Sequence, residues 1–137
     1  IVLDEVADLD ADAQGRVVRM MDAPGDHVPR FMATSQARLS ERMDGGKITS
    51  VTIAEDKSFT ASAAKKATHD YNAVNVPGKL AFGIHTEVGG RISSVGGGLP
   101  VIVDGEVVGG IGLSSGTPQQ DMDCAQAGLD HFETKRG

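Results

Sequence analysis

The sequence has little of several residue types, and each shortage narrows the range of structures and functions. Of its 137 residues none is tryptophan, one is tyrosine and one is cysteine. One cysteine in a chain excludes an internal disulfide framework and any metal site built from several thiolates. Because aromatic residues make up only 4% of the chain, Ala, Val, Ile and Gly have to fill the interior. We therefore expect tightly spaced layers.

The chain also lacks an excess of positive charge and a long apolar run. Its formal net charge is −6, whereas nucleic acids and anionic membranes attract positively charged surfaces. No apolar run approaches the roughly 18 residues that cross a bilayer, and no secretory signal segment is present. We expect a cytoplasmic protein that binds neither nucleic acid nor membrane. Export stays open because the sequence starts at Ile1 and not at a methionine.

The length and the distribution of glycine set the expected architecture. A chain of 137 residues that is 39% hydrophobic is long enough to bury one core, so residues 1–137 are expected to form a single domain. Ten of the 18 glycines lie between Gly89 and Gly116. We expect the remaining elements to pack on this glycine-rich stretch.

The last third of the chain contains two strong local signals. Two β-branched runs, Val101–Val103 and Val107–Ile111, flank the dipeptide Asp104-Gly105. Asp and Gly tolerate the positive φ angles of a type I′ turn, so a β-hairpin is predicted. Further on, Thr117 precedes Gln120 by three residues with Pro118 between them, which predicts a capping box and the start of a helix.

Upstream, the hydrophobic spacing predicts a first amphipathic helix from Leu3 to Met21. Short extended candidates follow at Val28–Thr34 and Leu39–Met43 and are expected to form a second hairpin. A helix capped by Ser50 is predicted to run to Lys66 with a face of small residues. The irregular segment Thr68–Val88 is expected to line a binding site, because long irregular segments in compact domains often do.

Four separated strings carry a family resemblance: RMDGG at 42–46, AEDKSFTA at 54–61, VGGGLPV at 95–101 and GGIGLSSGTPQQD at 109–121. In order and spacing they resemble the GlcG-like family, also described as haem-degrading or HbpS-like. The resemblance implies an α/β (α+β) fold of the profilin-like type, an antiparallel sheet of about five strands flanked by helices. It further implies a homo-oligomer or hetero-oligomer that binds a small molecule, above all haem or a related tetrapyrrole. The alternative it implies is a subunit of an enzyme acting on a small organic acid or aromatic compound.

Two interpretations stand for the glycine loop Gly96–Gly98 and for Lys57. The loop either presents backbone N–H groups to an anion or makes room where a helix approaches a strand end. Lys57 lies on a helical face of small residues, where burial would lower its pKa and favour a role as base or Schiff-base amine. The alternative is that it snorkels to solvent or pairs with Asp44 or Asp121. The enzyme hypothesis places Lys57 and this loop at the active site.

Other candidate residues follow from haem chemistry and from turn chemistry. A haem iron needs an axial ligand, for which His69, His85, Tyr71 or a methionine would serve, and Arg91 or Lys79 would meet the propionates. Arg42 and Asp44 either fix a turn or clamp a ligand. The predicted ligand-binding residues are Arg42, Asp44, His69, Tyr71, His85, Arg91, Gly96, Gly97, Gly98 and Pro100, with Lys57 as the candidate catalytic residue.

Several catalytic and metal-binding classes are disfavoured. The four histidines lack the spacing of a metal-binding pair, so no metal site is predicted. The glycines miss both phosphate-binding fingerprints. Gly112–Gly116 fits the G-x-S-x-G pattern of hydrolases, but the parallel sheet of that fold is not predicted and few residues follow to supply the triad partners. Cys124 lies on the core face of the last predicted helix, which favours an inert thiol.

Overall fold

The computed structural model describes residues 2–4, 40–42 and 46–136 of the chain. The strands and α-helices of this part are β1 (Val2–Asp4), β2 (Glu41–Arg42), α2 (Ile48–Ala64), α3 (Glu87–Gly90), β3 (Gly98–Val103), β4 (Glu106–Ser114) and α4 (Pro118–Arg136). Two 3-10 turns, η1 (Thr68–Tyr71) and η2 (Ile84–Thr86), lie between α2 and α3. The predicted mixed α/β class is confirmed. No helix in these ranges is both long and apolar enough to cross a membrane.

The described strands form one mixed sheet in the order β2-β1-β4-β3. β3 and β4 pair antiparallel, whereas β1 pairs parallel with both β2 and β4. The described part of the sheet is thus not purely antiparallel. The predicted helix from Leu3 is wrong at its first residues, because Val2–Asp4 pairs with Gly112–Ser114 as a strand. The rest of that helix, the candidate strand at 28–34 and the turn residues 43–45 lie outside the described residues.

The local signals in the last third are confirmed. The hairpin turns at Asp104 and Gly105, whose φ angles are 52° and 83°, as a type I′ turn requires. Thr117 and Gln120 form the capping box: the Thr117 N–H donates to Gln120 Oε1 at 2.8 Å, and the Gln120 N–H donates to Thr117 Oγ1 at 3.3 Å. Helix α4 begins at Pro118, directly after Thr117.

Helix α2 forms as predicted, but its cap does not. It runs from Ile48 to Ala64 with Lys47 as its N-cap, and no side chain caps it. Ser50 lies inside the first turn, and its hydroxyl is hydrogen-bonded to the Ser115 hydroxyl instead. The Ser50 hydroxyl, which the sequence pattern predicted to cap the helix, therefore makes a tertiary contact instead. The helix ends where Lys65 turns left-handed at φ 56°.

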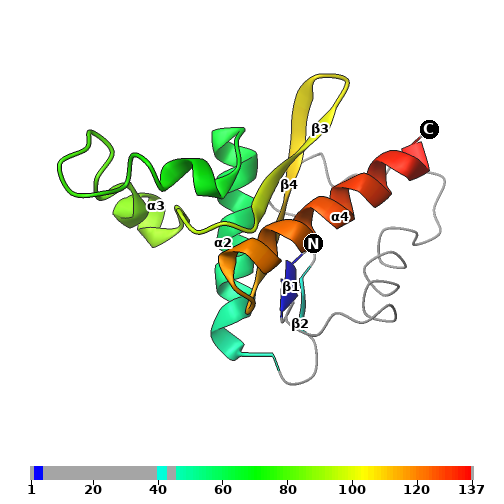
Figure 1. The fold of residues 1–137 in the computed structure, drawn as a ribbon, viewed down its shortest axis with the longest axis horizontal. Coiled ribbons are helices and arrows are strands. Elements are labelled where there is room, and N and C mark those ends of the chain that lie inside the picture. The colour runs from blue at the N-terminus through cyan, green and yellow to red at the C-terminus, as the bar shows by residue number, and fades with distance from the viewer. Residues whose placement is uncertain (1, 5–39, 43–45, 137) are drawn as a thin grey trace.

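The two long helices cover opposite faces of the sheet (Figure 1). Gly110 and Gly112 of β4 face α2, since a Cβ on either would meet the backbone of that helix. The intervening Ile111 and Leu113 face α4 and form a buried cluster with Ala125. Because successive strand residues point to opposite faces, the glycines of β4 face α2 and its large apolar side chains face α4. The small face of α2 thus lies directly on the strand backbone.

Between α2 and β3 the chain leaves the sheet as an arm, residues 72–90, that contains α3 (Figure 1). Single turns and short helical pieces build it, in agreement with the predicted irregular segment. Several large apolar side chains along the arm and just beyond it are exposed to solvent: Val74, Val76, Leu80, Phe82, Val88 and Val95. Most of these side chains therefore make little contribution to the core.

Candidate functional site

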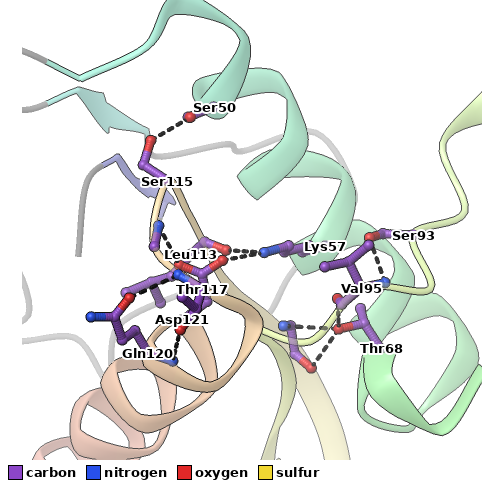
Figure 2. A network of polar contacts seen from close by, with 12 residues as sticks. Ser50, Lys57, Thr68, Ser93, Val95, Leu113, Ser115, Thr117, Gln120 and Asp121 are labelled. Carbon is purple, nitrogen blue, oxygen red and sulfur yellow. Dashed lines mark hydrogen bonds and ion pairs between the residues drawn. The ribbon is translucent and has the colours of Figure 1, made fainter. Parts of the chain in front are cut away.

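A buried ion pair joins the two helical layers (Figure 2). Lys57 of α2 donates from Nζ to Asp121 Oδ2 at 2.6 Å and to the backbone oxygen of Leu113 at 2.7 Å. Lys57 is 1% exposed and Asp121 is 2% exposed. The other carboxylate oxygen, Asp121 Oδ1, accepts the Gly116 N–H at 3.1 Å. The predicted pairing of Lys57 with Asp121 is confirmed.

Glycine makes this contact possible. Lys57 and Asp121 belong to helices on opposite faces of the sheet, so their side chains meet only past the end of β3. Gly97 lies at that point with φ 114°, and a Cβ there would stand 2.5 Å from Asp121 Cβ and 3.0 Å from Lys57 Nζ. Any side chain at this position would block the ion pair.

The surroundings of Lys57 favour a structural role over a catalytic one. Burial lowers the pKa of the Lys57 amine, and the hydrogen bond and negative charge of Asp121 act in the opposite direction. Removal from water thus makes the charged amine costly unless the carboxylate stays beside it. Nζ donates to two acceptors, and the Lys57 side chain is not exposed to solvent. The contacts are those of a buried pair that fastens α2 to the start of α4.

The contacts of the glycine loop match the close-packing interpretation. A Cβ on Gly96 would stand 2.9 Å from Met122 Sδ, and one on Gly98 would meet Thr68 Cγ2. The Gly98 N–H donates to Thr68 Oγ1 at 3.0 Å, and the same hydroxyl donates to the Val95 oxygen at 2.6 Å. Thr68 therefore occupies a backbone donor that an anion would need.

A second threonine holds the returning end of the arm. Thr60 Oγ1 donates to the Arg91 oxygen at 3.0 Å and accepts the Ser93 N–H at 2.9 Å. The Arg91 side chain is also engaged: its Nε donates to Asp56 Oδ1 at 3.0 Å, and its guanidinium stacks 3.9 Å from the centroid of Phe59. Arg91 thus fastens the arm to α2, and a role at propionates stays a prediction.

The structure brings the predicted haem ligands His69, Tyr71 and His85 to the base and the outer part of the arm. His69 is half-buried in η1, with Nε2 3.8 Å from the Asp70 carboxylate. Tyr71 is buried under the Lys66 ammonium, which lies 4.1 Å from the ring centroid. His85 is exposed, and its Nδ1 lies 3.1 Å from Asn75 Oδ1.

Asn75 is a functional candidate that sequence reasoning missed. Its side chain connects the outer part of the arm with the chain just beyond it, since Oδ1 also accepts the Gly83 N–H at 3.1 Å and Nδ2 donates to Ser94 Oγ at 3.1 Å. An asparagine in an irregular polar segment gives no periodic signal. Only its position between two turns, near a histidine ten residues away, points to such a role.

Of the remaining predicted site residues, Arg42 and Pro100 lie apart from the arm. Arg42 donates from its guanidinium to the Gly46 oxygen at 2.9 Å, a contact of the kind that the turn-fixing interpretation expects. Its predicted partner Asp44 is outside the described residues. Pro100 lies in β3 opposite Gly110, at the edge of the described sheet, where a missing N–H costs little. Lys79 is exposed on the arm.

Cys124 is the single cysteine of the chain. Cys124 is half-buried beside the core cluster, and burial, followed by the charges of Asp121 and Asp123, raises the pKa of its thiol. The thiol form therefore dominates at neutral pH, as expected for an inert cysteine. Within the described ranges no group of three or more His, Cys, Asp or Glu side chains is arranged to hold a metal ion.

The fold and these contacts define a mixed α/β domain with a glycine-lined ion pair at its centre and an apolar, histidine-bearing arm at its side. Residues 31–130 match the family model described as haem degrading protein HbpS-like. The chain belongs to this HbpS-like family, as the resemblance predicted.

Three similar proteins extend this comparison. A protein described as an uncharacterized 15.0 kDa protein in the dhaT-dhaS intergenic region of Citrobacter freundii is 39% identical over 94 residues, which span 69% of this chain and 66% of that protein. The corrinoid adenosyltransferase PduO of Salmonella typhimurium is 38% identical over 88 residues, 64% of this chain and 26% of PduO. The crystal structure of a PduOC:haem complex superposes with a TM-score of 0.66 at 35% identity, covering 69% of this chain and 68% of that one.

Proposed function

We propose that this domain binds a tetrapyrrole, and specifically haem. Its membership of the HbpS-like family supports the proposal, as do two relatives: one named for corrinoid chemistry and a structural neighbour described in complex with haem. Corrin and porphyrin are both flat tetrapyrrole macrocycles with a central metal ion, so the two relatives point to one class of ligand. This chain spans only part of PduO, and no adenosyltransferase step is assigned to it.

The observation that carries the proposal is the composition of the arm. A haem presents a broad apolar ring, a metal ion that takes an axial ligand, and two propionates. The arm exposes Leu80 and Phe82, which are apolar side chains of the kind that pack on a flat ring, and it exposes His85 between them and Val88. Exposed Lys79 supplies a cation for a propionate. The residues of the arm therefore fit this group.

A hemin titration of the purified chain tests the function. We expect a saturable change of the Soret band with a fixed stoichiometry, because an imidazole ligand and an apolar surface both alter the spectrum of free hemin. Cobalamin titrated in parallel separates haem from corrinoid binding within the tetrapyrrole class. If neither compound binds saturably, the proposed function is wrong.

We further propose that the chain forms a homo-oligomer through the arm. Large apolar side chains that lie exposed together on a monomer mark interaction surfaces, and Leu80 is fully exposed while Val88 is 56% exposed. Light scattering coupled to size exclusion is expected to give a multiple of the single-chain mass, and a Leu80→Ser/Val88→Ser variant should shift it toward the monomer. A monomeric wild-type chain at micromolar concentration would contradict this proposal.

The complete sheet is proposed to have the profilin-like arrangement with about five strands that the family resemblance implies. The described strands, in the order β2-β1-β4-β3 with helices on both faces, support this proposal. An experimental structure of the whole chain would test the strand count.

A further inference from the structure

The hydrogen bonds of Asn75 fix which nitrogen of His85 carries a proton. The Gly83 backbone N–H can only donate, so the amide atom that it meets at 3.1 Å is the oxygen Oδ1. The same oxygen lies 3.1 Å from His85 Nδ1. A carbonyl oxygen accepts and cannot donate, and therefore Nδ1 of His85 is the protonated nitrogen.

With the proton on Nδ1, the other ring nitrogen, Nε2, has a lone pair that can bind a metal ion. Neutral imidazole carries one N–H, so with Nδ1 protonated the lone pair of Nε2 lies in the ring plane and points away from Asn75. His85 is exposed, and no hydrogen bond to its Nε2 comes from the residues that the structure describes. Metal-binding histidines have this arrangement, in which one ring N–H is donated to a carbonyl or carboxylate and the other nitrogen meets the metal.

Asn75 also holds the ring in place. Its Nδ2 donates to Ser94 Oγ beyond the end of the arm, and its backbone N–H donates to the Tyr71 oxygen at 2.8 Å at the arm's beginning. The residue that orients His85 is thus fixed at both ends of the arm. An imidazole supported in this way loses less conformational freedom on binding.

The surroundings of His85 select a metal that brings its own ligands. A bare transition-metal ion needs three or four protein donors, and no cluster of that kind is present in the described ranges. A haem iron takes four nitrogens from the porphyrin and needs only an axial donor from the protein. Three residues before and after His85 are Phe82 and Val88, 57% and 56% exposed, which suit an apolar ring better than a hydrated ion.

The other described histidines lack this geometry. His69 turns Nε2 toward Asp70, while its Nδ1 is buried without a partner. His131 of α4 has a buried Nε2 without a partner. Tyr71 is 9% exposed and covered by Lys66. His69 and His131 thus each have a buried, unpartnered ring nitrogen and Tyr71 is covered, whereas His85 is exposed and its Nδ1 is already hydrogen-bonded to Asn75.

We propose that His85 Nε2 is an axial ligand of the haem iron and that Asn75 is the residue that positions its ring; this rests on the haem-binding function proposed above. Asn75 acts through the tautomer and orientation of His85 and does not touch the haem iron itself.

The test is a hemin titration of the 137-residue chain as wild type, His85→Gly and His69→Gly, followed by the Soret band and by electron paramagnetic resonance of the ferric form. His85→Gly is expected to lose the wild-type spectrum, and added imidazole is expected to restore it by occupying the vacated position. His69→Gly, the matched histidine deletion at the base of the arm, is expected to keep the wild-type spectrum. If wild type binds hemin and His85→Gly gives an unchanged spectrum, the ligand assignment is wrong while haem binding stands. If wild type does not bind, both fall.

The role of Asn75 is tested first in the haem-free protein and then by hemin affinity. Nitrogen NMR of the imidazole in the apo protein is expected to show His85 protonated at Nδ1 in wild type and a mixture of tautomers in Asn75→Ala. The same variant should bind hemin about 10- to 100-fold more weakly, the usual cost of losing such a supporting contact, with the fold checked by the backbone amide spectrum. An Nε2-protonated His85 in wild type would overturn the positioning role.

Discussion

Replacing Lys57 by Met is expected to lower the free energy of unfolding by about 3–5 kcal/mol, the cost of leaving a buried charge without its partner. Asp121 is 2% exposed, and without Lys57 only the Gly116 N–H would remain as a described partner of its carboxylate. The Leu113 backbone oxygen would lose its donor as well. Urea unfolding at pH 7 measures the difference.

The matched control is Lys47→Met, which removes an exposed lysine next to the first residue of the same helix. It is expected to change the free energy of unfolding by less than about 0.5 kcal/mol. The double variant Lys57→Met/Asp121→Leu removes both charges and should regain part of the loss, which also gives a readout if the single variant does not fold. A loss below about 1 kcal/mol in Lys57→Met would show that the pair contributes little.

Gly112→Ala is expected to lower the free energy of unfolding by about 3 kcal/mol, at the upper end of the range for overpacking. The added Cβ would meet the Ala54 oxygen and stand 2.6 Å from the Ser58 nitrogen. Both atoms belong to the backbone of α2, so no side chain can rotate out of the way and the helix itself must move. Thermal and urea unfolding would both record the loss.

Gly128→Ala is the matched control for this prediction. It lies in α4, where the nearest atom to an added Cβ is Ile111 Cδ1 at 2.8 Å, the end of a flexible side chain. Alanine also favours a helix by about 1 kcal/mol over glycine, so the net change should be small. Equal losses in the two variants would mean that α2 is not held against the strand backbone as described.

The features that the sequence predicts correctly depend on neighbours along the chain. The Asp104-Gly105 turn and the Thr117–Gln120 box need only a few adjacent residues, and both form as expected. Ser50 has an equally good local pattern, yet its hydroxyl bonds to Ser115, 65 positions away. Leu3 shows helical spacing but pairs with Leu113 as a strand. Long-range pairing overrides local preference at both positions.

The candidate site likewise contains one residue that the sequence predicts and one that it does not. Lys57 is conspicuous on a helical face of small residues, and Asp121 is one of two partners that the sequence proposed for it. Lys57 reaches Asp121 because Gly97 has no side chain between them, and this arrangement is visible only in three dimensions. Asn75 gives no signal at all, because its importance comes from facing Gly83, His85 and Ser94 at once.

The way the arm is fastened also bears on how such a domain can diversify. Thr60 and Thr68 both hold the chain that returns from the arm, through hydroxyl bonds to the backbone of residues 91–98. Backbone contacts do not depend on which side chains the intervening residues carry. Side chains between residues 72 and 90 can therefore be replaced without loss of these four threonine contacts, whereas replacing a glycine of β4 or one residue of the Lys57–Asp121 pair disturbs the contact between the sheet and its helices.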